Sequence, residues 1–488
     1  MAGLTASDDR PNARETVISP SGAPLVEEIS PVPDVMQTLS RFADEPDVLL
    51  LESALPQESV GRYSFLTADP VERFRIQDAE HGSDPFHAIR HKAREFVSPA
   101  IPELPPFQGG AAGLLGYELG HAWEELPRSG RDEFQFPDLA VGIYDWVVAW
   151  DHVQSRAWII SQGYPERTAA RRTDRASARL TWIKKRLGAT IDHIPSHSKS
   201  TRLSKEQLAP SWPAPGAKDL NSDFSRDAYL EAVDRAKEYI YAGDIFQANL
   251  SQRLLAPDDI GPVELYSRLR ARNAAPFAGY FACDDWAVVS ASPERLVSLR
   301  GDEIETRPIK GTRRRRPIPE ADLFTRDELR ASEKDTAENV MIVDLLRNDL
   351  SRVCVPGTVR VPQLCGVEMY ATVQHLVSVV RARIAGECDV WELFNAVFPG
   401  GSITGAPKIR AMEIIDELEP TVRGPYCGSL FYVGFDGRAD SSILIRTFIC
   451  RNGWIQCPVG GGIVAQSNAA DEYLETMHKA EGMLRALE

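Results

Sequence analysis

The stretch WAVVSASPERLVSLR (residues 286–300) decides the fold class. It is rich in β-branched and large apolar residues, which is typical of buried strands. The stretch SSILIRTFIC (441–450) has the same character, whereas KDTAENVMIVDLLRND (334–349) and DEYLETMHKAEGML (471–484) have helical periodicity. Strands alternating with helices in this way predict an α+β fold with large, mostly antiparallel sheets.

The amino-terminal half shows the same mixture of elements. We predict a buried strand in DVLLLES (47–53), a hairpin from WVVAWD (146–151) and RAWIIS (156–161), and an amphipathic helix over 166–188. Residues 189–222 shift to Ser, Pro and Lys and are the best linker candidate. A helix should begin after Ser225 and stop at Gly243. We therefore divide the chain into a disordered tail (1–25), an amino-terminal region (26–188), a linker (189–222) and a carboxy-terminal region (223–488).

Composition limits the partners of this 488-residue chain. Its net charge of −15 disfavours nucleic acid and anionic lipid, although a locally positive pocket could still take a small anion. The seven cysteines form no CxxC pair, which favours free thiols in a reducing cytoplasm. We find no signal peptide and no apolar run of the roughly 18 residues that a membrane span needs.

Two helices carry acids three residues apart. Asp335 and Glu338 share one face of the first, and Glu472 and Glu475 share one face of the second. Carboxylates converging from two helices would suit Mg²⁺, which prefers oxygen ligands and leaves positions for substrate oxygens. Acidic pairs on helices are more often a solvated face, so spacing alone leaves both interpretations open.

Arg446 lies inside the apolar sequence ILIRTFI. If this segment is one strand, alternation places Arg446 on one face with Leu444 and Phe448. A guanidinium among such neighbours needs an anion, either a structural carboxylate or a substrate carboxylate. Glu294 follows a proline just after an apolar strand, where burial would make it a general acid and exposure an ordinary surface residue.

Glycine-rich segments supply possible anion sites. FPGGSITGAPK (398–408) runs into a helix with Pro407 near its first turn, but it lacks the ending of a P-loop. CPVGGGIV (457–464) offers backbone amides to a closely approaching ligand. In ETRPIKGTRRRR (305–316), Lys310 is either a nucleophile or one more surface cation, and the arginines after it favour a solvated loop.

The order of these segments resembles the chorismate-utilising enzymes, which include component I of anthranilate synthase and of aminodeoxychorismate synthase. The resemblance covers the chain from about residue 25 and rests on LLLESA, GRYSFL, GGAAGLLGYELG, GDIFQANLSQR, SASPERL, RPIKGTRRR, AENVMIVDLLRNDLSRV, TVQHLVS, FPGGSITGAPK, ILIRT, GGGIV and DEYLETMHKAEGML. It implies two large antiparallel sheets packed as a sandwich, surrounded by helices, with chorismate between them.

The resemblance also assigns roles to residues. It implies Mg²⁺ as cofactor, held by Glu338 and Glu475 with Asp335 and Glu472 beside them, and Glu294 as the general acid for the C4 hydroxyl. The residues that it places around the substrate are Arg446, Tyr426, His375, Thr312, Ser402, Gly461, Gly462 and Gln247.

Two positions distinguish the members of this family by the reaction that they catalyse. Members that add water carry a lysine base where this chain has Gln247, and an amide cannot deprotonate water at neutral pH. Anthranilate synthases carry alanine at the position of Lys310, whereas aminodeoxychorismate synthases carry lysine there. We therefore predict amination at C4, with Lys310 as the nucleophile.

The resemblance further implies a separate glutaminase subunit, because the sequence has no glutaminase nucleophile elbow and Cys427 lacks the leading glycine of one. Leu51, Glu52 and Ser53 match the tryptophan-binding element of anthranilate synthases, although a plain core strand would also explain them. The alternatives are anthranilate synthase component I and a regulatory homologue that binds without catalysis. The latter is disfavoured because the implied catalytic, substrate-binding and metal-binding residues are all present.

Overall fold

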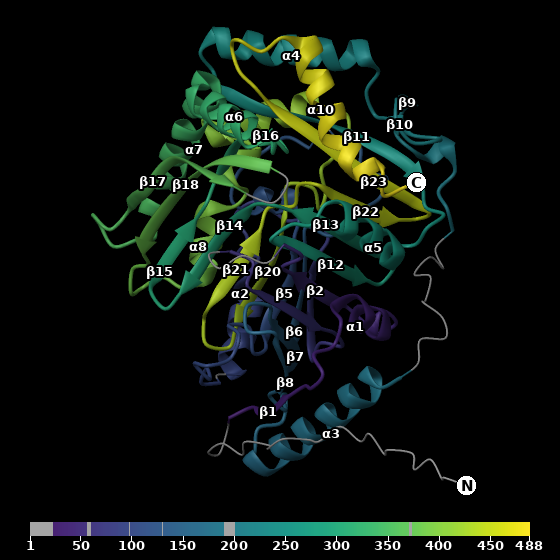
Figure 1. Cartoon of the computed structure of the whole chain (residues 1–488), viewed down its shortest axis with the longest axis vertical. Helices are drawn as coiled ribbons and strands as arrows, with labels where there is room; N and C mark the ends of the chain where they lie inside the picture. The colour runs from purple at the N-terminus through teal and green to yellow at the C-terminus, as the bar shows by residue number, and fades with distance from the viewer. Residues whose placement is uncertain (1–22, 56–59, 97, 129, 190–200, 370–372) are drawn as a thin grey trace.

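The computed structural model describes residues 23–55, 60–96, 98–128, 130–189, 201–369 and 373–488. Its strands form a 13-stranded sheet, called sheet A, and a 10-stranded sheet, called sheet B (Figure 1). Neighbouring strands pair antiparallel throughout both sheets. The predicted α+β class with large antiparallel sheets is confirmed.

Sheet A has the order β1-β8-β7-β3-β2-β12-β13-β22-β23-β11-β10-β9, with β19 beside β11. Its strands are β1 (Leu25–Glu28), β2 (Val48–Glu52), β3 (Tyr63–Thr67), β7 (Trp146–Asp151), β8 (Arg156–Ser161), β9 (Trp212–Pro213), β10 (Asn221–Ser222), β11 (Gln247–Pro257), β12 (Phe277–Cys283), β13 (Trp286–Ser292), β19 (Gly405–Ala406), β22 (Thr447–Arg451) and β23 (Trp454–Ile463).

Sheet B has the order β16-β18-β15-β14-β21-β20-β5-β6-β4, with β17 beside β18. Its strands are β4 (Glu72–Ile76), β5 (Gly110–Leu115), β6 (Leu139–Tyr144), β14 (Arg295–Arg300), β15 (Glu303–Thr306), β16 (Ile309–Arg314), β17 (Arg360–Met369), β18 (Val373–Arg383), β20 (Ser429–Gly434) and β21 (Ala439–Ser442).

Helices surround the two sheets. They are α1 (Val35–Phe42), α2 (His87–Ala93), α3 (Ala169–Leu187), α4 (Arg226–Ala242), α5 (Pro262–Arg272), α6 (Pro319–Ala331), α7 (Glu333–Ser351), α8 (Val390–Val397), α9 (Lys408–Leu418) and α10 (Ala469–Leu484), with 3₁₀ turns η1 (Arg94–Phe96), η2 (Tyr117–Ala122), η3 (Lys205–Gln207) and η4 (Gly401–Ile403). Among the described helices, none has the length and apolar character that a bilayer crossing requires.

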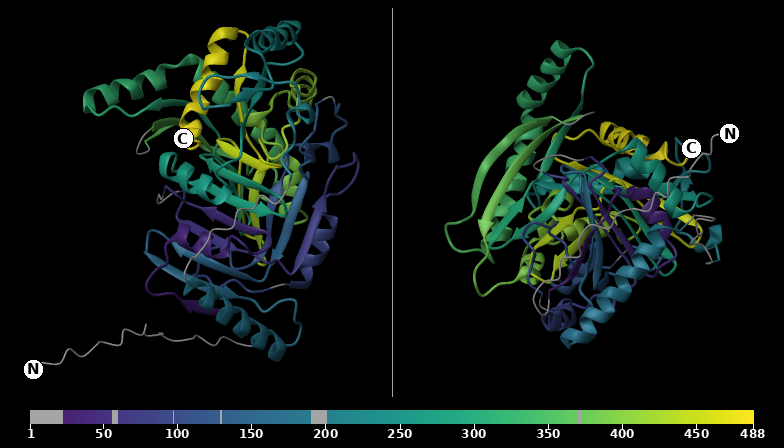
Figure 2. Two further views of the ribbon diagram at one scale, coloured as in Figure 1. Left: turned by 90° about the vertical axis from the view of Figure 1, so that its right-hand side faces the viewer. Right: turned by 60° about the horizontal axis from the view of Figure 1, so that its bottom comes forward.

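Two apolar cores hold these layers together. The larger one joins sheet A side chains such as Phe65 and Val288 to sheet B side chains such as Leu114 and Phe431. The second lies between sheet A and helices α1, α3, α5 and α10, where it contains Leu39, Ile183, Leu269 and Met483. In Figure 2 (left), α3 lies at the bottom of the molecule and α10, in yellow, near the top. The predicted sandwich is therefore observed, because one face of each sheet is buried against the other.

Local signals place several elements correctly. Ser225 caps α4 by accepting a hydrogen bond from the Ala228 amide, and Gly243 ends it in a left-handed conformation with φ of 85°. The hairpin of β7 and β8 pairs Trp146 with Ser161. The tail predicted over 1–25 lies almost wholly outside the described residues, but Leu25 already belongs to β1. Of the predicted linker, residues 201–222 contain η3 and the strands β9 and β10, which extend sheet A.

Candidate active site

The chain crosses between the two sheets at neighbouring points. Between β13 and β14 it passes from sheet A to sheet B at Pro293 and Glu294, and between β21 and β22 it returns through residues 443–446. The crossings are bonded together, because the Ile443 amide donates to the Glu294 carbonyl at 3.0 Å and the Ala291 amide donates to the Arg446 carbonyl at 3.0 Å. The opening stretch of sequence therefore spans both sheets and places Glu294 beside the Arg446 segment.

Arg446 corrects one sequence prediction. The segment ILIRTFI is not one strand, since residues 443–446 lie outside the strands and Arg446 has φ of +52°. The side chains of Ile443, Leu444 and Phe448 are all buried, so strict alternation does not apply. Both sheets contribute neighbours at a crossing, which removes the polar face that a single half-buried strand would keep.

The Arg446 guanidinium is partly buried and has no hydrogen bond or salt bridge among the residues that the structure describes. Burial lowers its pKa, and the nearby Glu294 carboxylate opposes that change. A guanidinium held in this way favours an anionic ligand. The loop containing Tyr426 lies against the same segment, because the Cys427 amide donates to the Leu444 carbonyl at 2.9 Å.

Glu294 is buried, with 4% of its surface exposed, and its Oε1 atom has no hydrogen-bond partner among the described residues. Burial raises the pKa of this carboxyl to about 7, although Ser402, Lys310 and Arg446 act in the opposite direction. A carboxyl that titrates near neutrality can exist as an acid at physiological pH and give up its proton during a reaction. The sequence prediction left burial open, and the structure places Glu294 in the interior.

Lys310 enters the same region from β16. Its Nζ atom donates to the carbonyl of Ser402 at 3.3 Å and lies 3.8 Å from Oε2 of Glu338. Burial lowers the pKa of Lys310, while Glu338 and Glu294 partly restore it. This lysine is therefore not a solvated loop cation, because desolvation favours the neutral amine that a nucleophile requires.

A bulge in β16 presents Lys310 and Thr312 together. The register against β18 shifts between these two residues at Gly311, whose φ is +67°. Thr312 then pairs with His375, and the Thr312 hydroxyl lies 2.9 Å from Nδ1 of His375. Burial and Arg446 lower the pKa of His375 to about 4, so the imidazole is neutral at physiological pH.

Gln247 on β11 lies beside the glycines of the neighbouring strand β23. The side-chain amide nitrogen and oxygen of Gln247 are buried, and within the described part of the chain neither has a hydrogen-bond partner. A Cβ atom at Gly462 would come within 2.5 Å of the Gln247 amide nitrogen. A larger residue at position 462 would therefore displace the Gln247 amide, which is available to a ligand.

The acids predicted from spacing do converge on one region. A Cβ atom at Gly461 would lie 3.3 Å from Oε2 of Glu472 and 3.7 Å from Oε1 of Glu475, both on α10. Glu338 on α7 reaches Lys310, and Asp335 packs over Gly311, where a Cβ atom would meet its Cγ atom at 2.9 Å. Figure 1 shows α7 at the upper left of the molecule and α10 to its right.

The carboxylate oxygens of these acids are the ligand type that a hard divalent cation prefers. Oε2 of Glu472 is buried without a hydrogen-bond partner, and burial raises the pKa of Glu338 with reinforcement from Asp335 and Glu475. Carboxylate oxygens that repel one another in a partly buried site are stabilised by a cation. Asp47, Cys283 and Asp284 also cluster, but Asp47 already pairs with Arg73 and Arg75.

A separate cavity of about 170 Å³ lies between the sheets. Leu51 and Ser53 line it from sheet A, and Arg295, Leu430 and Tyr432 line it from sheet B. Glu52 reaches its wall too, but the Glu52 carboxylate accepts hydrogen bonds from Tyr266 and Arg270 of α5. The segment predicted to bind tryptophan therefore borders a real cavity, and its carboxylate has other partners.

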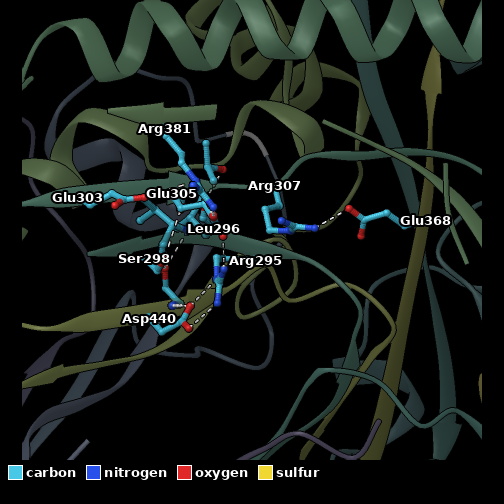
Figure 3. Close-up of polar contacts among 12 residues, drawn as sticks. Arg295, Leu296, Ser298, Glu303, Glu305, Arg307, Glu368, Arg381 and Asp440 are labelled. Atoms are coloured by element: carbon cyan, nitrogen blue, oxygen red, sulfur yellow. Dashed lines mark hydrogen bonds and ion pairs between the residues drawn. The ribbon is translucent and has the colours of Figure 1, made fainter. Parts of the chain in front are cut away.

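Arg295 connects this cavity to Glu294, the preceding residue in the chain. It is 4% exposed, and its guanidinium forms ion pairs with Asp440 and Glu305 at 2.8 Å each (Figure 3). Figure 3 also shows Arg381 beside Glu303 and Glu305. Arg295 was not singled out from the sequence, where only its place in the SASPERL segment marked it.

Comparisons with known proteins identify the family of this chain. A model of the chorismate binding enzyme family matches residues 47–485. The chain belongs to that family. Its enzymes use chorismate, so the predicted class of enzyme is confirmed.

Similar proteins carry two different names within this family. Aminodeoxychorismate synthase component 1 of Klebsiella aerogenes is 39% identical over 461 residues, covering 92% of this chain and 95% of the relative. Anthranilate synthase component 1 of Streptomyces coelicolor is 41% identical over 440 residues, covering 90% and 83%. A crystal structure of anthranilate synthase component I from Streptococcus pneumoniae TIGR4 has a TM-score of 0.72 at 30% identity, covering 88% of this chain and 94% of that one. Overall identity therefore does not separate the two activities.

Proposed function

We propose that this protein aminates chorismate at C4 to form 4-amino-4-deoxychorismate, as component 1 of an aminodeoxychorismate synthase. The observation that carries the proposal is the placement of Lys310, whose side chain is 13% exposed and whose Nζ atom meets the Ser402 carbonyl near Glu294 and Glu338. A surface lysine would be solvated, whereas this one is desolvated beside a carboxyl whose pKa is about 7.

The reaction needs one amine and one acid. The Lys310 amine forms a bond to C2 of the ring while the C4–oxygen bond breaks, and Glu294 gives its proton to the departing hydroxyl, which leaves as water. Ammonia then bonds to C4 while the bond from C2 to Lys310 breaks, and the product amine loses a proton. Two allylic displacements place nitrogen on C4, whereas one direct displacement would place it on C2.

The remaining residues hold the substrate. Arg446, with Tyr426 and the backbone near Gly461 and Gly462, would take the enolpyruvyl carboxylate, since its guanidinium has no hydrogen bond or salt bridge among the described residues. Mg²⁺ at Glu338 and Glu475, flanked by Asp335 and Glu472, would neutralise the ring carboxylate. Neutral His375 and Thr312 would lie against the ring. Gln247 offers no base, which favours an amine over water as the attacking group.

We infer that ammonia comes from a glutaminase subunit, in keeping with the "component 1" in the names of the relatives. Cys427 has a buried thiol whose pKa burial raises to about 12, which is unsuited to a glutaminase nucleophile. A cytoplasmic location is consistent with seven cysteines that are all free thiols.

The second candidate is anthranilate synthase component 1, which the Streptomyces relative favours by its 41% identity. Lys310 opposes it, because direct amination at C2 needs no nucleophilic amine from the protein. The cavity beside Leu51 and Ser53 is compatible with both activities, and we propose that it binds tryptophan as a structural or regulatory ligand.

Product identity tests the proposal. The purified chain would receive chorismate, Mg²⁺ and a large excess of an ammonium salt, with and without an aminodeoxychorismate lyase. We expect p-aminobenzoate only when the lyase is present, and we expect Lys310→Ala to abolish it. Fluorescent anthranilate formed without the lyase would instead assign the chain to C2 amination, and an unimpaired Lys310→Ala variant would remove the lysine from the mechanism.

A further inference from the structure

Two lysines that sequence reasoning did not single out contact the carboxylates of the proposed metal site. Nζ of Lys334 lies 3.4 Å from Oε1 of Glu472, and Nζ of Lys479 lies 2.8 Å from Oε1 of Glu475. Lys334 belongs to α7 and Glu472 to α10, so this pair links the helices that supply the acids. Lys479 also donates to the Gly460 carbonyl at 2.9 Å.

The arrangement of charge explains why these contacts exist. Glu338, Glu472, Glu475 and Asp335 converge from two helices, where Lys310 lies 3.8 Å from Glu338 and Arg313 lies 3.2 Å from Asp335. Without other cations, carboxylates on facing helices would repel one another and separate the helices. The Lys334 and Lys479 ammonium groups offset that repulsion at Glu472 and Glu475.

We propose that Lys334 and Lys479 are exchangeable counter-ions, which neutralise the acidic site of the free enzyme and which Mg²⁺ must displace. This inference rests on the metal site of the proposed function. Mg²⁺ carries twice the charge of an ammonium group and coordinates several oxygens at once, so it replaces both contacts when it enters.

Both lysine side chains can move away from their carboxylate partners. Their exposed fractions are 49% for Lys334 and 45% for Lys479, so each can swing its ammonium group into water on a flexible stem. Lys479 would also keep the Gly460 carbonyl as a partner after Glu475 turns to the metal. The buried Lys310 cannot leave in this way, since only 13% of its side chain is exposed.

Calorimetric titration of the purified chain with MgCl₂, in the absence of chorismate, tests the proposal. Lys334→Met and Lys479→Met should each bind Mg²⁺ about two- to tenfold more tightly than the wild type, because half-exposed ion pairs of this kind are weak. Lys334→Arg and Lys479→Arg keep the charge and should bind like the wild type. Lys92→Met, which removes a similar lysine pairing with Glu72 away from this site, is the matched control and should change nothing.

The outcomes separate the inference from the function on which it rests. If the wild type binds Mg²⁺ and the methionine variants bind no more tightly, the counter-ion inference is wrong while the metal site stands. Weaker binding by these variants would show instead that the lysines position the carboxylates. If no protein in the series binds Mg²⁺, both the inference and the proposed metal site are overturned.

Discussion

Opposite effects of burial prepare two side chains for the same reaction. Desolvation lowers the pKa of Lys310 and raises that of Glu294, so each is shifted toward its uncharged form. An uncharged amine is a nucleophile and an uncharged carboxyl is an acid. Neither role could be chosen from residue type alone, since exposed lysine and glutamate are charged at neutral pH.

The raised pKa of Glu294 predicts how activity depends on pH. The proposed acid role of Glu294 needs its protonated form, which predominates below about pH 7 and is lost as the pH rises through that value. With free ammonia held constant, kcat/KM for chorismate should therefore fall on the alkaline side. Glu294→Gln should lower kcat by about 10²- to 10⁴-fold and flatten that limb. A wild-type profile without an alkaline limb would remove Glu294 from the acid role.

At the scale of elements, one bulge decides where Lys310 points. Gly311 adopts φ of +67° in β16, and a Cβ atom there would lie 2.9 Å from the carboxyl carbon of Asp335. The bulge sets Lys310 and Thr312 opposite adjacent residues of β18, whereas regular pairing would set them opposite residues two positions apart. The PIKGT motif therefore encodes a backbone shape as well as the proposed nucleophile.

Alanine substitutions test that role. Gly301 in the β14–β15 turn has a similar φ of +65°, and no atom lies within 4 Å of the position that a Cβ atom would take. Gly301→Ala should lower the free energy of unfolding by about 1 kcal/mol from backbone strain and leave activity unchanged. Gly311→Ala should be more destabilising and should lower kcat/KM by about tenfold or more, as measured by urea unfolding and product formation. Equal behaviour of the two variants would refute the bulge argument.

At the scale of the whole molecule, the cavity of about 170 Å³ exists only because the sheets pack together. Its walls come from segments that are far apart in the chain, such as those of Leu51 and Tyr432. A ligand bound there contacts both sheets, so it should stabilise the sandwich as a unit.

Thermal unfolding with and without L-tryptophan would show this stabilisation. A ligand present at about 100 times its dissociation constant contributes about 2.7 kcal/mol, which is enough to raise Tm by a few degrees. Ala278→Val, which adds methyl groups to the cavity wall, should weaken the effect, and L-alanine as a control ligand should give none. An unchanged Tm with tryptophan would leave the cavity as a packing feature.

The sequence by itself determined the elements and the family. Caps such as Ser225 and Gly243, the alternation in the β7–β8 hairpin and the periodicity of α7 and α10 are local, because backbone conformation depends on near neighbours. The order of the motifs then identified the family. The three-residue spacing of the acids placed the two acids of each pair on one face of the same helix.

Only the tertiary structure decided how those residues are used. It broke the predicted strand at Arg446, because that segment crosses between sheets and cannot keep one face toward each. It turned the Glu52 carboxylate toward Tyr266 and Arg270. It also brought Lys334 and Lys479 to the carboxylates of Glu472 and Glu475. Burial and ion pairing join residues that are distant in the chain, and no local pattern records which charges will meet once the two sheets close on each other.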